Sequence, residues 1–417
     1  MCLTGAIVLA LGCGGEAPSS STSSSTPAGD VPTSANAVPL VVNAGPPRVG
    51  YVNGVFTSVT ICIPRTTRCQ TIDSVLVDTG SIGLRVVSSA AGGQLSLELP
   101  AQTEADGDSL AECGALVDSY TWGSVRLADV VMGGEVAASV PIQLIGDPAS
   151  EAVPESCYSS GGASADTVAD LGANAILGVG PLAQDCGSPC ADSPDASGSE
   201  NPGNVYYACA SSGCRPTAVP VASQIQNPVS RLDSDNNGVV VDLSSVSSDG
   251  APSVTGTLYL GIGTQPNNAL GTATVLPIDP SSLTFTTVYL GRPYAGSFID
   301  SGSNGYYFLS SKVSGLPACS DSSGGYYCPS GTTSIEVTNR GVTNRGVTGA
   351  TSVVAFRVAN ADTLLSHDSD FVFDNLAGPS ESGAGFDFGL PFFFGRRVFS
   401  SIEGTEAPGG TSPYVAY

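Results

Sequence analysis

Histidine and lysine are almost absent from this sequence of 417 residues, which contains one histidine, His367, and one lysine, Lys312. Catalysis by a Ser-His-Asp or a Cys-His arrangement would have to use His367. That residue lies in the polar run Ser366–Asp370, which is typical of a solvated turn. A zinc cluster needs closely spaced cysteine and histidine ligands, and the cysteines do not occur in such a pattern. These absences argue against both catalytic classes and against a metal site.

Positive charge is scarce throughout the chain. There are 14 Lys and Arg residues against 37 Asp and Glu residues, which gives a formal net charge of −23. Nucleic acid is not an expected partner, because phosphate binding requires clustered cations. An anionic membrane surface would repel the chain as well, and protonation of its carboxylates at acidic pH would relieve its self-repulsion.

Long hydrophobic runs are missing too. The N-terminal apolar run, residues 2–12, is too short to span a membrane and is typical of an export signal. Leu9–Cys13 resembles the bacterial lipoprotein cleavage box, so residues 1–13 are predicted to be a signal peptide that ends at Cys13, the expected site of lipidation. Residues 14–37 are rich in Ser, Thr and Pro and are predicted to be a disordered tether. We therefore expect a bacterial cell-envelope lipoprotein, facing the periplasm or on the outer membrane, that contacts the membrane only through its lipid anchor; simple secretion is the alternative.

The 12 cysteines are better explained by disulfides than by metal binding, because an exported protein meets oxidising conditions. Proximity in the sequence predicts three local pairs and one group of four cysteines that pair among themselves. The pairs are Cys62–Cys69, Cys113–Cys157 and Cys319–Cys328, and the group is Cys186, Cys190, Cys209 and Cys214.

The composition favours a β-rich protein. The chain has 52 glycines and 29 prolines, which suits many short strands and turns. Apolar and polar residues alternate in 254–262 and 352–358, as they do in half-buried strands. The length allows two domains of ordinary size. We therefore predict an all-β fold with two domains.

One short motif occurs twice, once in each half of the chain. The first copy is centred on Asp78 and the second on Asp300, 222 residues later (300 − 78). In each copy an apolar run leads into an Asp, a hydroxyl residue, a glycine and another hydroxyl residue, which predicts a strand that ends in a tight turn. Glycine allows close approach of two backbones, and the hydroxyl groups can donate and accept hydrogen bonds. The residues expected to support the two aspartates are Thr79, Gly80, Ser81, Ser301, Gly302 and Ser303.

Two such turns that face one another would bring the carboxylates of Asp78 and Asp300 to about 3 Å from each other, the distance at which a proton is shared. Like charges at this distance do not both ionise, so one carboxyl acts as a base while the other acts as an acid. This pair can activate a water molecule against a carbonyl group.

These motifs resemble those of the pepsin-like aspartic peptidases, and more closely those of a bacterial family of uncharacterised exported proteins that carry both copies. The resemblance implies a bilobal pepsin-like fold with the cleft between its lobes, which we expect at residues 38–263 and 264–417. It also implies that Asp78 and Asp300 are the catalytic pair. Each lobe of that fold has an apolar-apolar-Gly strand under its active loop; Ile176–Gly178 fits the first of these strands, and Phe386–Gly389 approximates the second.

The resemblance also places a flap hairpin over the cleft, near residues 118–123. Leu116 falls near the position of the flap tyrosine, with Tyr120 and Trp122 as alternatives, although both could instead pack in the core of the hairpin. Arg85 stands where such proteins usually have a tryptophan that braces the flap. We expect Arg85 to lie beside the cleft and to lower the pKa of nearby carboxyls.

We therefore predict an aspartic endopeptidase that acts on peptide or protein substrates without a cofactor, as a monomer. The alternative is a cell-surface binding module on the same fold that does not catalyse hydrolysis. The altered flap and Arg85 favour the binding module. The two complete motifs favour the enzyme, since a scaffold needs no acid pair.

Overall fold

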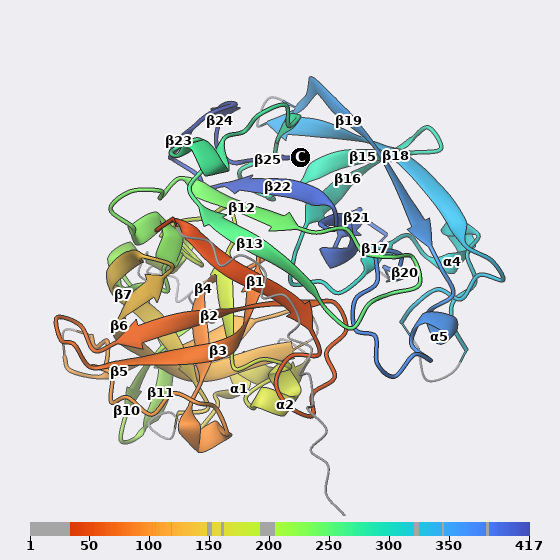
Figure 1. Ribbon diagram of the computed structural model, residues 1–417. Coiled ribbons are helices and arrows are strands. Elements are labelled where there is room, and N and C mark those ends of the chain that lie inside the picture. Colours follow the sequence, from red (N-terminus) through yellow and green to blue (C-terminus); the bar gives the residue numbers. More distant parts are fainter. Residues whose placement is uncertain are drawn as a thin grey trace, which may run out of the picture. The chain divides into compact units, whose positions relative to one another are not determined.

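The computed structural model in Figure 1 describes residues 34–104, 106–117, 119–147, 152–159, 162–191, 205–320, 325–343, 346–380 and 383–417. These residues belong to a compact unit that spans Pro32–Tyr417. The expected signal peptide, Cys13 and the expected tether up to residue 33 lie outside the described residues. The first described strand begins at Ala37, the last residue of the expected tether.

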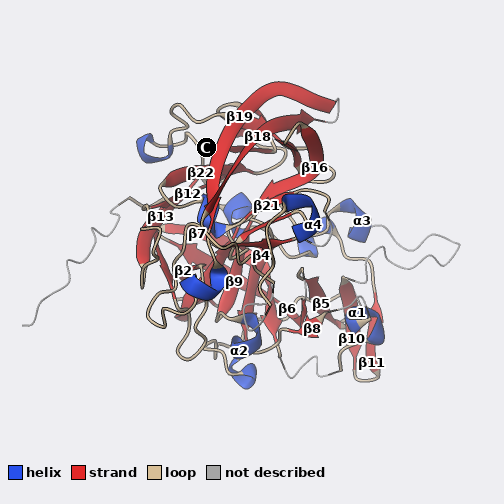
Figure 2. Ribbon diagram, turned by 90° about the vertical axis from the view of Figure 1, so that its right-hand side faces the viewer, coloured by secondary structure: helices blue, strands red, loops and turns tan. Residues whose placement is uncertain are grey.

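Strands dominate the described chain, as the all-β prediction requires, and Figure 2 shows its helices as short turns among the strands. The strands of the first half are β1 Ala37–Asn43, β2 Gly54–Cys62, β3 Cys69–Asp78, β4 Ile82–Val87, β5 Ser109–Ala115, β6 Ser119–Met132, β7 Glu135–Ile145, β8 Ala163–Ser164, β9 Ala175–Val179, β10 Tyr206–Ala210, β11 Gly213–Pro216, β12 Gly238–Leu243 and β13 Val254–Leu260. Those of the second half are β14 Val275–Pro277, β15 Phe285–Tyr289, β16 Arg292–Ile299, β17 Tyr306–Phe308, β18 Thr333–Thr343, β19 Gly346–Val358, β20 Ala377–Pro379, β21 Phe386–Phe388, β22 Arg396–Ser401, β23 Glu406–Ala407, β24 Gly410–Thr411 and β25 Tyr414–Ala416. The α-helices are α1 Glu155–Tyr158, α2 Val168–Leu171, α3 Ser188–Ala191, α4 Ser311–Ser314 and α5 Ala361–Leu364, and the 3₁₀ turns are η1 Ser89–Ala91, η3 Val221–Ser223, η4 Pro228–Arg231, η5 Pro266–Asn268 and η6 Leu390–Phe392.

Two large sheets contain most of these strands. The larger has 16 strands, 15 of them in the order β11-β10-β5-β6-β7-β4-β9-β3-β2-β1-β13-β12-β22-β25-β14, and β8 pairs with β6 beside this path. The other has seven strands in the order β19-β18-β15-β16-β21-β17-β20. Strands from the two halves of the chain meet in the larger sheet, because β12 pairs with β22. Figure 1 shows β12, β13 and β22 running side by side at this junction.

The last residues of β3 are buried because the strand is covered by neighbours on both edges. It pairs antiparallel with β2 and parallel with β9, and Val75–Asp78 are all buried. Strands inside a sheet that is packed on both faces read as continuous apolar runs, which explains the sequence Val75–Val77. β3 therefore runs through the buried core and ends at Asp78.

Aromatic side chains fill the core of the second lobe around β17 and β21. Phe308 and Phe386 stack with their ring centroids 5.1 Å apart, and Phe356 contacts Phe308 edge-on at 5.5 Å. Phe388 lies 6.0 Å from Phe386 on the same strand. Phe386 and Phe388 therefore both point into the core, and the intervening residue of β21 points away from it.

The described cysteines form five disulfides, which indicate an oxidising, exported environment. All of the pairs expected from local spacing are present, and the group of four pairs internally. The bonds are Cys62–Cys69, Cys113–Cys157, Cys186–Cys190, Cys209–Cys214 and Cys319–Cys328.

Within the described ranges, no helix is both long and apolar enough to cross a membrane.

Candidate active site

The two repeated motifs form turns that meet in the structure. β3 ends at Asp78, whose register partner on the parallel strand β9 is Gly178. β16 ends at Ile299, directly before Asp300, and its partner on the parallel strand β21 is Phe388. The two aspartates thus leave equivalent strand ends, and each is only 8% exposed.

Hydrogen bonds run in both directions between the two turns. The backbone N–H of Thr79 donates to Ser301 Oγ at 3.0 Å, and the N–H of Ser301 donates to Thr79 Oγ1 at 2.9 Å. Ser301 Oγ also donates to the carbonyl oxygen of Val77 at 2.8 Å. Because each hydroxyl binds the backbone of the opposite turn, neither turn can move without breaking bonds to the other.

Within the first turn, two donors orient the carboxylate of Asp78. The N–H of Gly80 donates to Asp78 Oδ1 at 2.8 Å, and Ser81 Oγ donates to Oδ2 at 2.5 Å.

The second turn repeats this pattern around Asp300. The N–H of Gly302 donates to Asp300 Oδ1 at 2.7 Å, and Ser303 Oγ donates to Oδ2 at 2.8 Å. Hydrogen bonds to an ionised carboxylate are among the stronger kinds, so they fix its orientation.

The glycines of both turns face the aspartate of the other turn. A Cβ added to Gly80 would lie 2.6 Å from Asp300 Cγ, and one added to Gly302 would lie 2.6 Å from Asp78 Oδ1. A Cβ does not approach a carbon or an oxygen to which it is not bonded this closely. Glycine at these two positions therefore makes room for the two carboxyls to lie together, which explains why the motif contains it.

Burial and a neighbouring carboxylate raise the pKa of Asp300 well above its usual range. Burial has the largest effect, followed by the charges of Asp78 and Asp387 and by a hydrogen bond with Asp78, while the hydrogen bond from Ser303 opposes them. The pair formed by Asp78 and Asp300 therefore holds a proton over a wide pH range.

Asp387 is a third carboxyl beside this pair, and it is not among the site residues predicted from the sequence. It is the middle residue of β21, between Phe386 and Phe388. Burial raises its pKa to about 8, with a smaller contribution from the charge of Asp78 and an opposing hydrogen bond with Ser303. The signal was present in the sequence, since an Asp occupies an apolar position of the apolar-apolar-Gly strand.

Arg85 lies on β4 with 6% of its surface exposed. Its guanidinium group forms a close ion pair with Glu112 of β5 and lies 3.6 Å from Asp185, and it donates to the carbonyl oxygen of Ile82 at 2.6 Å. Its charge is therefore directed to these two carboxyls, and the charges that act on Asp300 come from other carboxyls. Arg85 thus lowers the pKa of a nearby carboxyl, as expected, but that carboxyl is Asp185, whose pKa burial raises more strongly. Arg85 is not among the groups that shift the pKa of Asp300, and it connects β4 to β5.

The hairpin expected to be the flap is formed by β5 and β6, and its two aromatic candidates are buried. Tyr120 and Trp122 pack in one cluster with Tyr207, and the Trp122 and Tyr207 rings meet edge-on at 5.1 Å. This is the core-packing alternative that the sequence left open. Near the tip of the hairpin, Leu116 packs against a neighbouring apolar cluster, whereas Val117 is 98% exposed.

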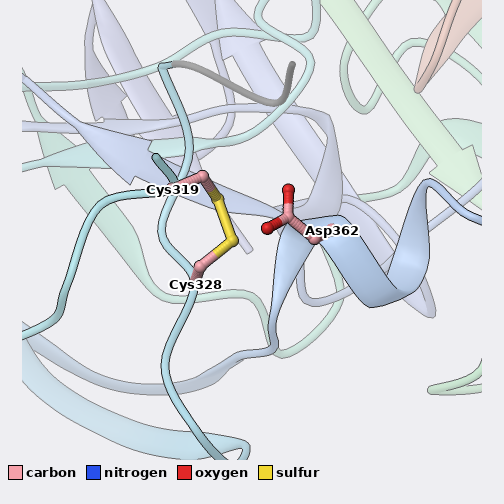
Figure 3. A group of neighbouring side chains, drawn as sticks. All are labelled: Cys319, Cys328 and Asp362. Atoms are coloured by element: carbon pink, nitrogen blue, oxygen red, sulfur yellow. A yellow bond between two sulfur atoms is a disulfide. The ribbon is translucent and has the colours of Figure 1, made fainter. Parts of the chain in front are cut away.

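Cys319, Cys328 and Asp362 lie close enough together to resemble a metal site, with their ligand atoms within 4.8 Å of one another. Figure 3 shows that the two sulfurs are bonded to each other. A disulfide offers no thiolate to a metal ion, so this group supplies only one carboxylate.

The arrangement of strands and paired turns is the fold of a pepsin-like aspartic proteinase. The crystal structure of an aspartic proteinase from Irpex lacteus is similar to this chain with a TM-score of 0.50 and 15% sequence identity, covering 91% of this chain and 96% of that one. At this identity the similarity shows the fold alone, which is bilobal and nearly all-β. The chain belongs to the protein family of unknown function DUF3443, whose family model matches residues 32–417. None of the curated proteins compared with the chain matches it.

Proposed function

We propose that the protein is an aspartic endopeptidase in which Asp78 and Asp300 activate a water molecule for attack on a peptide bond. One observation carries this proposal: two buried carboxyls are held against each other by turns that hydrogen-bond in both directions. A pair of this kind is costly to maintain, because like charges repel and burial penalises ionisation. A role in acid and base catalysis explains why the protein keeps a pair that lowers its stability.

In this mechanism the water molecule lies between the two carboxyls. The ionised carboxyl accepts a proton from the water as its oxygen attacks the substrate carbonyl carbon. The protonated carboxyl donates a hydrogen bond to the developing oxyanion and later protonates the leaving amine. The two carboxyls share the proton as a coupled pair, so either of them can hold it at the start of the cycle.

A second candidate is a binding module that uses the same cleft without hydrolysis. The flap favours it, since Tyr120 and Trp122 are both buried in the hairpin and are not available to a substrate. The paired carboxyls argue against it, because peptide binding alone does not require a shared proton.

The test is cleavage of an unfolded protein by the purified full chain between pH 3 and 8, followed by mass spectrometry of the fragments. Asp78→Asn and Asp300→Asn should each reduce the rate by about 10²-fold or more, the usual contribution of a general acid or base. Asp368→Asn is the control, because this aspartate is exposed and distant from the motifs in sequence. A wild-type protein that binds peptides without cutting them would favour the binding module.

We also propose that the protein is a bacterial cell-envelope lipoprotein that acts as a monomer on peptides or proteins. The five disulfides support export. The sequence Leu9–Cys13 supports lipidation of Cys13. The net charge of −23 supports a partner other than nucleic acid.

A further inference from the structure

A buried side-chain donor holds the backbone where each active turn ends. The residue that directly follows the motif is Ile82 in the first copy and Asn304 in the second. The carbonyl oxygen of Ile82 accepts a hydrogen bond from Arg85 Nη1 at 2.6 Å. The carbonyl oxygen of Asn304 accepts one from Asn53 Nδ2 at 2.8 Å, although Asn53 is 251 residues away in the sequence. The end of the second turn is therefore held by the first half of the chain.

The side chain of Asn53 is fully buried and uses its whole amide group. Besides its bond to Asn304, Nδ2 donates to the carbonyl oxygen of Phe373 at 3.0 Å, and Oδ1 accepts from the N–H of Phe373 at 2.8 Å. Because both amide hydrogens and the oxygen have partners, the orientation of the amide is fixed. The backbone of Asn53 has φ of +53°, a conformation that asparagine adopts more readily than most residues. Asparagine therefore suits this position both in its backbone and in its side chain.

Asn304 is anchored by its side chain as well as by its carbonyl oxygen. Its Oδ1 accepts from the hydroxyl of Tyr307 at 2.6 Å, and its Nδ2 donates to the hydroxyl oxygen of Tyr326 at 2.9 Å. Both tyrosines belong to the second half of the chain, so Asn53 supplies the bond that reaches Asn304 from the first half.

The neighbouring residue connects this anchor to the carboxyl of Asp300. Ser303 directly precedes Asn304, and its hydroxyl donates to Asp300 Oδ2 at 2.8 Å. Asn53 directly precedes β2, which pairs with β3, the strand that ends at Asp78. Asn53 thus joins the strand beside the first aspartate to the turn that orients the second.

We propose that Asn53 is a positioning residue for Asp300, which it acts on by holding the carbonyl oxygen of Asn304 and thereby the hydroxyl of Ser303. This inference rests on the proposed peptidase function. Because Asn53 is fully buried, it does not touch the substrate, and its effect reaches the reaction only through the turn.

Asn53→Gly removes the three side-chain hydrogen bonds, introduces no charge, and leaves the positive φ without strain. The matched control is Asn36→Ala. Asn36 is also fully buried and also makes three side-chain hydrogen bonds, but its partners Leu260 and Asn267 lie outside both turns. Both variants should lose stability, and only Asn53→Gly should change the properties of the pair formed by the two aspartates.

The first readout is the separation of kcat from KM, measured with a peptide that spans a bond cut by the wild type. In Asn53→Gly, kcat per folded molecule should fall by up to about 10²-fold, the effect of a misplacement of roughly 1 Å. KM should stay unchanged, because no substrate contact is removed. The fluorescence of Trp122, the single tryptophan, gives the folded fraction. Asn36→Ala should keep the wild-type kcat per folded molecule.

The second readout is the width of the pH profile. The turns are already packed against each other at Gly80 and Gly302, so a loosened turn moves the two carboxyls apart. Carboxyls that are farther apart repel each other less, so the upper pKa of the pair falls and the lower one rises. The bell-shaped profile of kcat/KM should therefore become narrower by about one pH unit in Asn53→Gly. A residue that only supports the fold would leave this width unchanged.

A double-mutant cycle tests the route through Ser303. If Asn53 acts on Asp300 through the Ser303 hydroxyl, Asn53→Gly and Ser303→Ala should together reduce kcat by less than the product of their separate effects. Ser81→Ala, the equivalent change beside the first aspartate, should multiply with Asn53→Gly. Independent effects of Asn53→Gly and Ser303→Ala would contradict the proposed route.

A second variant covers the case in which Asn53→Gly does not fold. Asn53→Asp keeps the acceptor for the N–H of Phe373 and places an oxygen, in place of Nδ2, against the carbonyl oxygen of Asn304. Its kcat per folded molecule should fall, and should fall further as the introduced carboxyl ionises, because only the protonated form can donate. A kcat equal to that of the wild type at every pH would overturn the inference.

The failure of this inference can be told apart from the failure of the peptidase proposal. If the wild type cleaves no protein, the peptidase proposal fails, and carbon NMR of the ¹³C-carboxyl-labelled full chain still follows the titration that is lost in Asp300→Asn. Asn53→Gly should lower the pKa of that titration while Asn36→Ala leaves it unchanged. If the wild type is active but Asn53→Gly keeps its kcat per folded molecule and the width of its pH profile, Asn53 has no positioning role and the inference is wrong.

Discussion

Thr79 and Ser301, 222 residues apart in the sequence, each donate a backbone N–H to the side-chain oxygen of the other residue. This exchange joins the two turns at the residues that directly follow the two aspartates. Replacing either hydroxyl would leave one buried N–H without a partner. An unsatisfied buried donor costs more than a hydrogen bond normally contributes, so the exchange should matter both for stability and for activity.

Ser301→Ala should lower the free energy of unfolding by about 1–3 kcal/mol, since it removes the acceptor for the Thr79 N–H and the donor to Val77. Cleavage activity should fall as well, because the turns would no longer hold the carboxyls in register. Urea unfolding and peptide cleavage measure the two effects. Ser281→Ala is the matched control, because this serine is exposed and its observed bond uses the backbone. Equal stability and equal cleavage activity of the two variants would show that the hydrogen bonds between Thr79 and Ser301 contribute nothing to either property.

Gly80→Ala tests the close approach of the two turns. Its Cβ would lie 2.6 Å from Asp300 Cγ, so the turns must separate to accept it. We expect cleavage to fall by about 10²-fold, because catalysis depends on the carboxyl geometry to within roughly 1 Å. In the control, Gly331→Ala, the added Cβ would have no heavy atom within 4 Å. Full activity of Gly80→Ala would mean that the turns tolerate a wider separation than the structure indicates.

The sequence predicted the paired turns because their chemistry is local and repeated. Two apolar runs ending in Asp, hydroxyl, Gly and hydroxyl residues specify strand, turn and side-chain donors together. The role of Arg85 was not predictable in this way. Its partner Glu112 lies on β5 and its partner Asp185 directly precedes Cys186, and no spacing in the sequence links either of them to β4.

The position of Asp387 was predictable in part. The sequence placed it on the strand under the second active loop, but its proximity to Ser303 depends on which face of β21 points to the turn. That face is set by the aromatic packing of Phe386 and Phe388 in the second lobe. A prediction of the facing direction would have required knowledge of the assembled core.

The raised pKa of Asp387 also predicts how stability depends on pH. A carboxyl whose pKa is higher in the folded state binds more protons in that state, so its contribution to stability is present at low pH and is lost as pH rises. The loss should extend from about pH 4, near the pKa of the unfolded chain, to about pH 8, the folded value for Asp387. Over this range the wild type should lose more stability than Asp387→Asn, as judged by urea midpoints. Parallel curves for the two proteins would contradict the raised pKa.

The buried ion pair between Arg85 and Glu112 should stabilise the flap hairpin without setting the pH optimum. Arg85→Met leaves Glu112, which is fully buried, without its cation, and breaking such a pair costs about 3–5 kcal/mol. Arg357→Met is the control, because its pair with Asp374 is partly exposed, with 46% of the arginine side chain accessible, and should cost about 1 kcal/mol or less.

The pH profile of the same Arg85 variant separates its two possible roles. If Arg85 only connects β4 to β5, as its contacts indicate, the folded fraction of Arg85→Met should keep the wild-type optimum. A displaced optimum would show that its charge acts on Asp78 and Asp300 after all.

The final prediction concerns Cys13, which lies outside the described residues. Leu9–Cys13 predicts acylation of this cysteine, and each buried CH₂ group of an acyl chain contributes about 0.8 kcal/mol to membrane binding. Cys13→Ser should therefore move the protein from the membrane fraction to the soluble fraction of cells. Its folding should not change, because all five disulfides use other cysteines. Mass spectrometry of the wild-type N-terminal peptide should find the acyl groups; an unacylated protein released into the medium would support simple secretion instead.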